Sequence, residues 1–452
     1  MKKVKVRFPP SPTGYCHVGT ARMALLNFLF GKKHGGTIIF RSEDTDKARS
    51  KREYEDDIVD SLTWLGLAWD EFYRDSELID THREALKKLI DAGKAYVSKE
   101  ESMREPGKEV EVVRLKNPGM TITFSDVIRG EITFDTTELG DFVIARSIDD
   151  PLYHLAVVVD DGEMGITHVI RGEEHISNTP RQILIQEALG YERPIYAHYP
   201  LFLSSDRAKL SKRKGDVAVK EYRAEGFLPE ALLNFIGILG WTPPSGREIL
   251  SLQEMVTEFE LENLHKSGAV FDMEKLRWFN REYLLKMRDD DFEALALDRL
   301  RAALTERKVE WSEGVARKLM RLVHERVSVW SDIDELAGEG EFDYFFSDPQ
   351  PGVAELPQKN TAPEEAARHL EAVVQMLHEL PDADFSVPEN IKAVVWPYAE
   401  EKGRGNVLWP LRYSLSGRAK SPDPFLIASI IGKDTSLRRI KAAIGLLERM
   451  RQ

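Results

Sequence analysis

Pro10-Ser11-Pro12-Thr13-Gly14-Tyr15-Cys16-His17-Val18-Gly19-Thr20 lies between two segments of different hydrophobic periodicity. The apolar run 4–8 before it predicts a buried strand, and the pattern over 21–30 after it predicts a helix. A strand that turns sharply into a helix presents backbone N–H groups and a positive dipole end to an anion. Gly19 lets a phosphate approach the backbone, and His17 can donate a hydrogen bond to it. The alternative is an ordinary loop with a solvated histidine.

A second motif, Lys209-Leu210-Ser211-Lys212-Arg213-Lys214-Gly215, brings four cations together near the middle of the chain. These cations can stabilise the negative charge that develops as pyrophosphate leaves a nucleotide. Ser211 and Gly215 favour a loop that can close over a bound substrate. The alternative is a basic surface loop, as most basic runs are. Each motif is weak evidence alone, and the two together indicate one nucleotide site.

The composition is that of a large soluble enzyme. The chain has 452 residues, enough for about three domains, and 42% of them are hydrophobic. No apolar stretch is long enough to span a membrane. The N-terminus runs directly into the predicted strand, so we expect no secretion signal and a cytoplasmic location. The single cysteine, Cys16, excludes an internal disulfide framework and a cysteine-based zinc site.

The net charge of −13 hides an uneven distribution of charged residues. Segment 331–401 carries 17 acidic and 3 basic residues, whereas segment 402–452 carries 11 basic and 3 acidic residues. Such a change of sign can create a local phosphate-binding face on an acidic protein. The alternative is a helical tail whose lysines and arginines face water.

Strand and helix patterns alternate through the first half of the chain. The patterns predict strands over 4–8 and 37–41, helices over 53–66 and 81–93, strands over 121–135, 142–145 and 153–160, and a helix over 178–189. This alternation predicts a parallel, doubly wound sheet, interrupted by a small inserted lobe at about 96–141. Ligands of such sheets bind at the carboxyl ends of the strands, where the first motif lies. Beyond 221 the chain is predicted to be helical, and a stretch rich in Pro, Gly and acids, 338–363, divides the helical part.

Four further blocks follow predicted elements: Arg41-Ser42-Glu43-Asp44-Thr45-Asp46, Thr167-His168-Val169-Ile170-Arg171-Gly172-Glu173-Glu174-His175, Leu408-Trp409-Pro410-Leu411-Arg412 and Ser421-Pro422-Asp423-Pro424-Phe425. With the first two motifs, which correspond to the HIGH and KMSKS signatures of class I aminoacyl-tRNA synthetases, they resemble the bacterial-type glutamyl-tRNA synthetases over about 4–447. The resemblance implies an α/β Rossmann-type catalytic core (1–95 and 142–220) with an inserted, reduced α/β acceptor-binding lobe (96–141). An all-α stem-contact domain (221–300) and an all-α anticodon-binding region (301–452) are expected to follow.

The resemblance also implies the reaction and its partners. Glutamate and ATP form glutamyl-adenylate with release of pyrophosphate, and the glutamyl group is then transferred to the terminal ribose of tRNA. Magnesium is expected on the ATP phosphates, held mostly by the nucleotide and water. In this family glutamate activation typically requires bound tRNA, and the enzymes are typically monomers. Some members charge glutamate tRNA alone, and others also charge glutamine tRNA.

Site residues are carried over from the family one position at a time. For glutamate they are Arg7 at the side-chain carboxylate with Tyr153 assisting, Arg171 at the α-carboxylate, and Ser11 and Glu43 at the α-amino group. For ATP they are His17, Gly19, Thr20, Glu174, His175, Lys209, Leu210 and Lys212, of which His17, Gly19, Lys209 and Lys212 are the catalytic candidates.

Structural alternatives stay open for several of these residues. Arg7 could pair with a core carboxylate, and Arg171 could pair with Glu173 or Glu174. Glu43 could belong to a solvated helix start, and Tyr153 could be sheet packing.

For the tRNA anticodon the candidates are Arg326, Trp330, Trp409, Arg412 and Arg418, although helical packing explains the two tryptophans equally well. The sequence departs from the family at Thr20, where histidine is usual, and in the short, cysteine-free stretch 96–112, where many relatives carry a longer and sometimes zinc-binding insertion. We therefore expect no zinc. The alternatives are a glutaminyl-tRNA synthetase, a shortened paralogue that modifies a tRNA base, and a non-enzymatic tRNA-binding relative.

Overall fold

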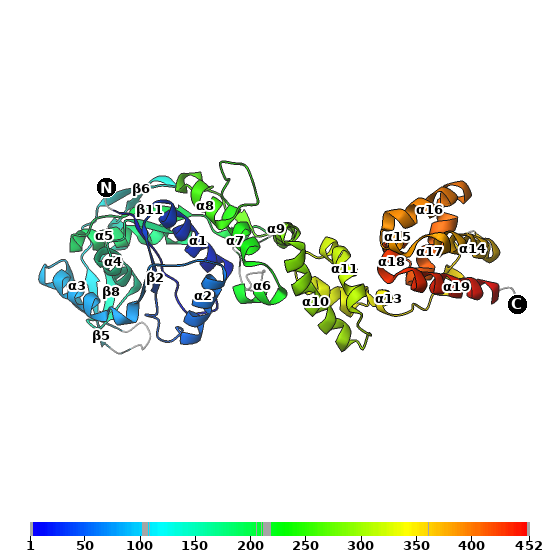
Figure 1. The fold of residues 1–452 in the computed structure, drawn as a ribbon. Helices are drawn as coiled ribbons and strands as arrows, with labels where there is room; N and C mark the ends of the chain where they lie inside the picture. Colours follow the sequence, from blue (N-terminus) through cyan, green and yellow to red (C-terminus); the bar gives the residue numbers. More distant parts are fainter. Residues whose placement is uncertain are drawn as a thin grey trace. The chain divides into compact units, whose positions relative to one another are not determined.

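The computed structural model describes residues 3–101, 107, 109–204, 206–208, 210, 218–359 and 361–449. The chain forms two compact units, Met1–Tyr283 and Leu284–Gln452 (Figure 1). Of the second sequence motif, Leu210 is described, whereas Lys209 and 211–215 lie outside the described residues.

Parallel strands form the centre of the first unit. Strand β1 (Lys5–Phe8) pairs with β2 (Thr37–Ser42), which pairs with β3 (Glu71–Arg74), and β10 (His168–Gly172) pairs with β11 (Ile195–Tyr199). The two groups meet where Thr167 N donates to Lys5 O at 2.9 Å. Successive strands therefore lie farther from this junction on both sides, β1 to β3 on one side and β10 to β11 on the other. This reversal is the topological switch point at which doubly wound folds bind their ligands.

Helices cover both faces of these strands (Figure 1). On one face, a Cβ added to Gly31 of α1 (Val18–Lys33) would lie 2.7 Å from Ile38. On the other face, Ile39 shares a core with α3 (Ile79–Asp91), α4 (Tyr153–Glu163) and α5 (Thr179–Leu189). Neighbouring residues of a strand point to opposite faces, so Ile38 and Ile39 serve different layers. The predicted parallel, doubly wound core is confirmed.

An antiparallel region interrupts the parallel strands. Strands β4 (Ala95–Glu101), β5 (Glu109–Leu115), β8 (Phe142–Ser147) and β9 (Asp150–Pro151) form one sheet in that order. Between them, β6 (Thr121–Asp126) and β7 (Gly130–Asp135) form a hairpin that joins β11 through Asp126 and Tyr196. The exact lobe boundaries at 95/96 and 141/142, like those at 220/221 and 300/301, stay predictions.

The strand predicted over 153–160 is wrong, because these residues begin helix α4. Leu155 to Val159 are all buried, since α4 packs against α3, α5 and β8. A continuous apolar run shows no periodicity that distinguishes a buried strand from a buried helix. The β-branched Val157–Val159 favoured the strand, and packing on several sides overrode that preference.

The remaining elements of the first unit are α2 (Arg52–Trp64), η1 (Asp75–Glu77), η2 (Thr137–Leu139), η3 (Glu173–Asn178), β12 (Phe202–Leu203), α6 (Val219–Glu225), α7 (Pro229–Ile238), α8 (Leu252–Glu258), η5 (Leu261–Asn263), β13 (Ala269–Val270) and α9 (Met273–Lys286), whose last turn enters the second unit. Helices 53–66, 81–93 and 178–189 are confirmed as α2, α3 and α5, with boundaries shifted by one or two residues.

The described part of the second unit is helical. Its elements are α10 (Asp289–Glu306), α11 (Glu313–Arg326), α12 (Ser331–Gly338), α13 (Asp343–Phe346), η6 (Val353–Glu355), α14 (Pro363–Glu379), α15 (Asp382–Phe385), α16 (Pro388–Lys402), α17 (Arg404–Ser416), α18 (Pro424–Ile431) and α19 (Lys433–Arg449). Among the described residues, no helix has the length and apolar character needed to cross a bilayer.

Candidate active site

A cavity of about 700 Å³ lies at the carboxyl ends of β1 and β10, where the strand order reverses. Most of the residues carried over from the sequence line it: Ser11, His17, Gly19, Thr20, Glu43, Tyr153, Arg171, Glu174, His175 and Leu210. These residues come from segments that are far apart in the chain. The fold therefore brings the first motif and Leu210, the one described residue of the second motif, to one cavity.

His17 caps the N-terminus of α1 with its side chain. Its Nδ1 accepts hydrogen bonds from Gly19 N at 3.1 Å and Thr20 N at 3.3 Å. We expected these N–H groups to be free for a phosphate, and the structure instead gives them to the imidazole. Because Nδ1 accepts, Nε2 carries the proton and can donate; in this structure it lies 3.3 Å from Thr20 Oγ1. The His17 ring therefore lies over the N-terminus of α1, where the helix dipole is positive.

Gly19 makes this cap possible. A Cβ at residue 19 would lie 3.0 Å from both Nδ1 and Cε1 of His17. The glycine in the motif therefore serves the approach of the histidine ring, in addition to any approach by a phosphate.

Arg7 and Arg41 are held by one buried carboxylate, Asp161 of α4. Asp161 Oδ1 accepts from Arg7 Nε at 3.0 Å and from Arg41 Nη1 at 2.8 Å, and Oδ2 accepts from Arg7 Nη2 at 3.1 Å. Burial alone would raise the pKa of Asp161, but the two guanidinium groups hold it below its usual value. Arg7 does not line the cavity, and its Nη1 has no hydrogen-bond partner among the described residues. The core pairing considered for Arg7 is thus present, and it leaves one donor free.

Glu43 lies between this buried cluster and the cavity. Its backbone N–H donates to Pro10 O at 3.0 Å, and its Oε1 accepts from Arg41 Nη2 at 3.5 Å. The side chain is buried rather than solvated. Burial raises the pKa of Glu43 to about 7, although Arg41 and Arg7 act in the opposite direction. A carboxylate with this pKa and position can bind a cationic group when it is ionised.

Arg171 is 4% exposed and contacts neither of the two glutamates considered as partners. Its Nε donates to His198 Nε2 at 3.0 Å and its Nη2 to Thr179 Oγ1 at 2.9 Å. Glu173 pairs instead with Arg129 at 2.6 Å. Arg171 therefore meets the cavity as a positive charge that no carboxylate among the described residues neutralises.

Tyr153 and His175 form the polar wall beside Arg171. The Tyr153 hydroxyl lies 3.4 Å from His175 Nδ1, which also lies 3.1 Å from Asn178 Nδ2. Burial, assisted by Arg171, lowers the pKa of His175 to about 3, so the ring is neutral near pH 7. Burial also raises the pKa of Tyr153 to about 12, so its hydroxyl stays protonated and can donate. Because 153–160 is helical, Tyr153 reaches the cavity from the first turn of α4.

Sequence reasoning missed several residues of this region. Arg22 of α1 lines the cavity, donates to Pro200 O at 2.6 Å and lies 4.4 Å from the Phe202 ring centroid. Asp161 ends an apolar run, and two consecutive acids at such a place were a usable signal. Arg22 had none, because an arginine within a predicted helix looks like any surface residue.

The proposed anticodon candidates are held in several ways within the second unit. Arg412 donates to Ala419 O at 2.8 Å and lies 5.1 Å from the Trp409 ring centroid. Arg326 and Arg412 line one surface hollow of about 630 Å³, and Arg418 is paired with Glu341. Trp330 is 8% exposed and stacks on Phe292 at 5.2 Å, which favours the packing alternative for this tryptophan.

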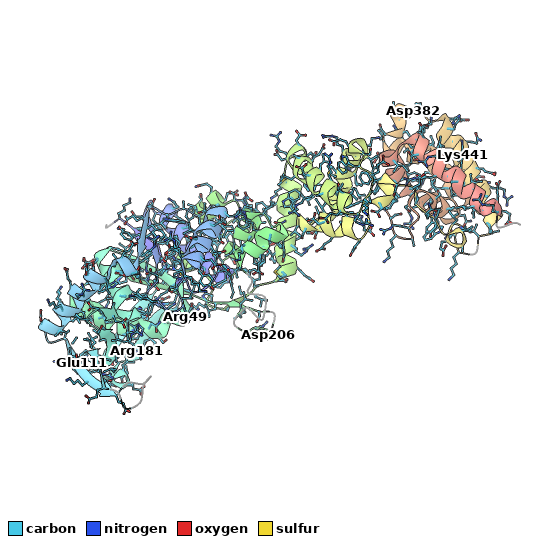
Figure 2. All side chains as sticks on the ribbon, turned by 90° about the horizontal axis from the view of Figure 1, so that it is seen from below. Arg49, Glu111, Arg181, Asp206, Asp382 and Lys441 are labelled. Atoms are coloured by element: carbon cyan, nitrogen blue, oxygen red, sulfur yellow. The ribbon has the colours of Figure 1, made fainter. Side chains whose placement is uncertain are left out.

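The basic tail is largely paired with the acidic segment that precedes it. Six of its described cations have carboxylate partners: Lys402 with Glu401, Arg404 with Glu400, Arg418 with Glu341, Lys433 with Asp382, and Arg438 and Arg439 with Asp348. Lys441, labelled with Asp382 in Figure 2, is exposed and has no ion pair within the described chain. Fewer cations of the tail are therefore unpaired than the residue count implied.

Comparison with known proteins agrees with this architecture. A family model described as tRNA synthetases class I (E and Q), catalytic domain, matches 3–111 and 99–278, and one described as an anticodon binding domain matches 274–444. The glutamate–tRNA ligase of Heliobacterium modesticaldum is 38% identical over 99% of this chain and 98% of its own length. That of Bacillus subtilis is 36% identical over 97% of this chain and 99% of its own length.

A solved structure is similar over the same extent. The crystal structure of a glutamate tRNA ligase from Elizabethkingia meningosepticum, in complex with its amino acid, has a TM-score of 0.84 at 32% identity. It covers 98% of this chain and 99% of that one. The similarity extends over both compact units, and the chain therefore belongs to the bacterial-type glutamate–tRNA ligases, class I aminoacyl-tRNA synthetases.

Proposed function

We propose that this glutamate–tRNA ligase holds glutamate and ATP side by side in the cavity at the reversal of strand order. The observation that carries the proposal is Arg7 Nη1, a buried donor without a partner among the described residues, in the cluster that adjoins the cavity through Glu43. An unsatisfied buried donor is costly, so it indicates an acceptor that arrives with a ligand. The side-chain carboxylate of glutamate is such an acceptor, and it carries the complementary charge.

Glutamate has two carboxylates and one ammonium group, and the residues around the cavity supply the complementary charges. Arg7 takes the side-chain carboxylate, with the Tyr153 hydroxyl as an additional donor. Arg171, which lines the cavity, takes the α-carboxylate. Glu43 and Ser11, on the same cavity, take the ammonium group.

ATP occupies the remaining part of the cavity. His17 Nε2–H donates to a phosphate oxygen beside Gly19 and Thr20, since Nδ1 is already used as the acceptor of the helix cap. Glu174, His175 and Leu210 contact the ribose and base. Lys209 and Lys212 stabilise the leaving pyrophosphate; they lie outside the described residues, so this role is supported by the sequence motif alone.

No side chain acts as a covalent nucleophile in this scheme. The α-carboxylate oxygen of glutamate forms a bond to the α-phosphorus of ATP, and the bond to pyrophosphate breaks. The terminal ribose hydroxyl of tRNA then attacks the activated carbonyl, and AMP leaves. The protein contributes orientation and preorganised positive charge.

The experiment that tests the proposal is aminoacylation with labelled glutamate and labelled glutamine on separate transcripts of glutamate tRNA and glutamine tRNA. We expect glutamate, and not glutamine, to be attached to glutamate tRNA. Absence of glutamate on both transcripts would overturn the proposal. Charging of the glutamine transcript with glutamate would place this enzyme among those that serve both tRNAs.

We expect glutamate binding to weaken as the pH falls through 7. Only ionised Glu43 attracts the substrate ammonium group, and its pKa is raised to about 7 by burial. Below that pH the protonated, neutral form predominates, so kcat/KM for glutamate at saturating ATP and tRNA should decrease about tenfold per pH unit. A pH series from 5.5 to 8.5 measures this. The Glu43→Gln variant is the control, and its low kcat/KM should be independent of pH. If the variant keeps the pH profile of the wild type, the assignment of Glu43 to the ammonium group is contradicted.

We expect Arg412→Ala to weaken tRNA binding about tenfold while ATP binding is unchanged. Arg412 lines the surface hollow of the second unit, and its side chain also holds the loop at Ala419. Filter binding of labelled tRNA measures the effect. Arg404→Ala is the matched control, because Arg404 is an arginine of the same helix that is already paired with Glu400 at 2.6 Å. Equal tRNA affinities for the two variants would contradict the role of Arg412.

Several finer points are part of the proposal, and no feature of the fold tests them. They are magnesium on the ATP phosphates, the absence of zinc, a monomeric state, a cytoplasmic location, and the choice between glutamate tRNA and glutamine tRNA.

A further inference from the structure

A chain of buried side chains leads from the β6–β7 hairpin to the cavity. Asp126, at the end of β6, lies 2.6 Å from His198 Nδ1 through its Oδ2. His198, on β11, accepts from Arg171 Nε through its Nε2 at 3.0 Å. Asp126 is 2% exposed, His198 0% and Arg171 4%. The three side chains therefore connect the inserted region to the arginine that faces the substrate.

The proton positions along this chain follow from the donors. A guanidinium Nε–H always donates, so His198 Nε2 must accept and its Nδ1 must carry the proton. Nδ1–H then donates to the Asp126 carboxylate. Burial lowers the pKa of His198, although Asp126 acts in the opposite direction, and the ring is neutral. Burial alone would raise the pKa of Asp126, but the hydrogen bond from His198 keeps it low.

Asp126 is itself fixed by the turn that follows it. Its Oδ1 accepts from Ile128 N at 3.0 Å and Arg129 N at 2.8 Å. Arg129 returns to the parallel strands, where its Nε donates to His198 O at 3.1 Å. The carboxylate cannot rotate without breaking the turn, so Oδ2 stays directed at His198.

At the other end, Arg171 is held in one orientation. Nε is occupied by His198, and Nη2 donates to Thr179 Oγ1 at 2.9 Å. The Tyr196 ring, stacked against His198 at 6.1 Å, lies 5.9 Å from the guanidinium carbon. Within the described residues no hydrogen bond engages Nη1, so this nitrogen is available to a ligand.

We propose that Asp126 and His198 are positioning residues, which orient the Arg171 guanidinium for the α-carboxylate of the amino acid substrate. The inference rests on the proposed function, because it takes Arg171 as the residue that binds this group. His198 acts as an oriented acceptor, and Asp126 fixes the tautomer that makes it one. The inserted hairpin thus contributes to amino acid binding without touching the amino acid.

Asp126→Asn tests the tautomer with almost no change of shape, because His198 N, which donates to Oδ2 at 3.1 Å, also lies 3.3 Å from Oδ1 and keeps an acceptor there. The turn requires an acceptor at Oδ1, so the new amide nitrogen faces His198 Nδ1. An N–H donor at this position forces the His198 proton onto Nε2. The Nε2–H group then points at Arg171 Nε–H, so two donors face each other and the hydrogen bond is lost. We expect the KM for glutamate in aminoacylation to rise ten- to a hundredfold, and the KM for ATP to stay within twofold. Thr133→Val, which removes an exposed threonine pair on the same hairpin, is the control and should change neither constant.

His198→Gln and His198→Leu provide a second comparison. A glutamine can place an acceptor near the position of Nε2, whereas leucine cannot, so the glutamine variant should retain more glutamate affinity than the leucine variant. If both variants lose thermal stability equally and keep the wild-type KM for glutamate, the two residues are structural and the inference is wrong.

A double-mutant cycle separates this inference from the proposed function. Arg171→Lys alone should raise the KM for glutamate, and an unchanged value would contradict the role of Arg171 itself. If Asp126 acts through Arg171, adding Asp126→Asn to Arg171→Lys should change the KM less than twofold further. If Arg171→Lys alone raises the KM as expected and the effects of the two substitutions are fully additive, the positioning role is overturned, whereas the role of Arg171 stands.

Discussion

Arg7→Leu is expected to reduce kcat/KM for glutamate about a thousandfold, equivalent to about 4 kcal/mol of transition-state stabilisation. The variant removes a buried donor that is left for the substrate, Arg7 Nη1, and leaves the side-chain carboxylate of glutamate unpaired in a dry site. The KM for ATP should change little. Discrimination against glutamine should fall as well, because the lost charge is what distinguishes a carboxylate from an amide. Steady-state aminoacylation with both amino acids measures these effects.

Lys5→Met is the matched control for this variant. Lys5 lies on the same strand and forms an ion pair with Glu71 at 3.3 Å, away from the cavity. It should leave both KM values within twofold. Arg7→Leu also deprives Asp161 of one partner, so its melting temperature must be recorded beside its kinetics. A folded variant with wild-type kcat/KM for glutamate would remove Arg7 from the site.

Arg41→Met is expected to destabilise the first unit by about 3–5 kcal/mol. Arg41 is 0% exposed and lies 2.8 Å from Asp161, 3.5 Å from Asp75 and 3.5 Å from Glu43. Without its cation these buried carboxylates lose their main compensation, and each must either stay charged at a high cost or take up a proton. Urea unfolding at pH 7, followed by far-UV circular dichroism, measures the loss.

The loss should be larger at pH 8 than at pH 5.5. Burial raises the pKa of Asp75 to about 9, whereas an unfolded aspartate titrates at about 4. Between these values the folded state binds a proton that the unfolded state releases, so stability falls as the pH rises. Removing Arg41 raises the neighbouring pKa values further and steepens this dependence. Arg83→Met, at an exposed arginine paired with Asp80 and Asp149, should leave the urea midpoint unchanged at both pH values. A similar shift in both variants would contradict the special role of Arg41.

The order of strands and helices could be predicted because, in most elements, hydrophobic residues recur with the period of a strand or of a helix. The alternation over the first half of the chain fixed the parallel core, and Gly66 and Gly93, with φ of +77° and +66°, stand at the helix ends where they were expected. Helix α4 could not be predicted in this way. Its burial on several sides comes from elements distant in sequence, and such a run carries no periodic signal.

Several residues that face the cavity could be found from motifs, whereas Arg22, which also faces it, and the positioning residues behind Arg171 could not. His17 and Arg171 lie in recognisable blocks, and the structure brings both to one cavity. Asp126 and His198 lie in ordinary strand patterns, and their link to Arg171 depends on the pairing of β6 with β11. The distribution of charge along the sequence was also a poor guide to phosphate binding, since a count of residues cannot show which cations already have carboxylate partners.

The internal pairing of the basic tail also bears on how tRNA binding should respond to salt. Ionic strength weakens RNA binding because each phosphate that a protein cation neutralises releases a counterion condensed on the RNA. Arg438 and Arg439 are already paired with Asp348, so they offer less net positive charge to a phosphate than unpaired arginines would. The tRNA affinity of the helical unit should therefore depend less steeply on salt than its 11 basic residues after position 401 imply. Selectivity for one RNA is then expected to rest mainly on shape and base contacts.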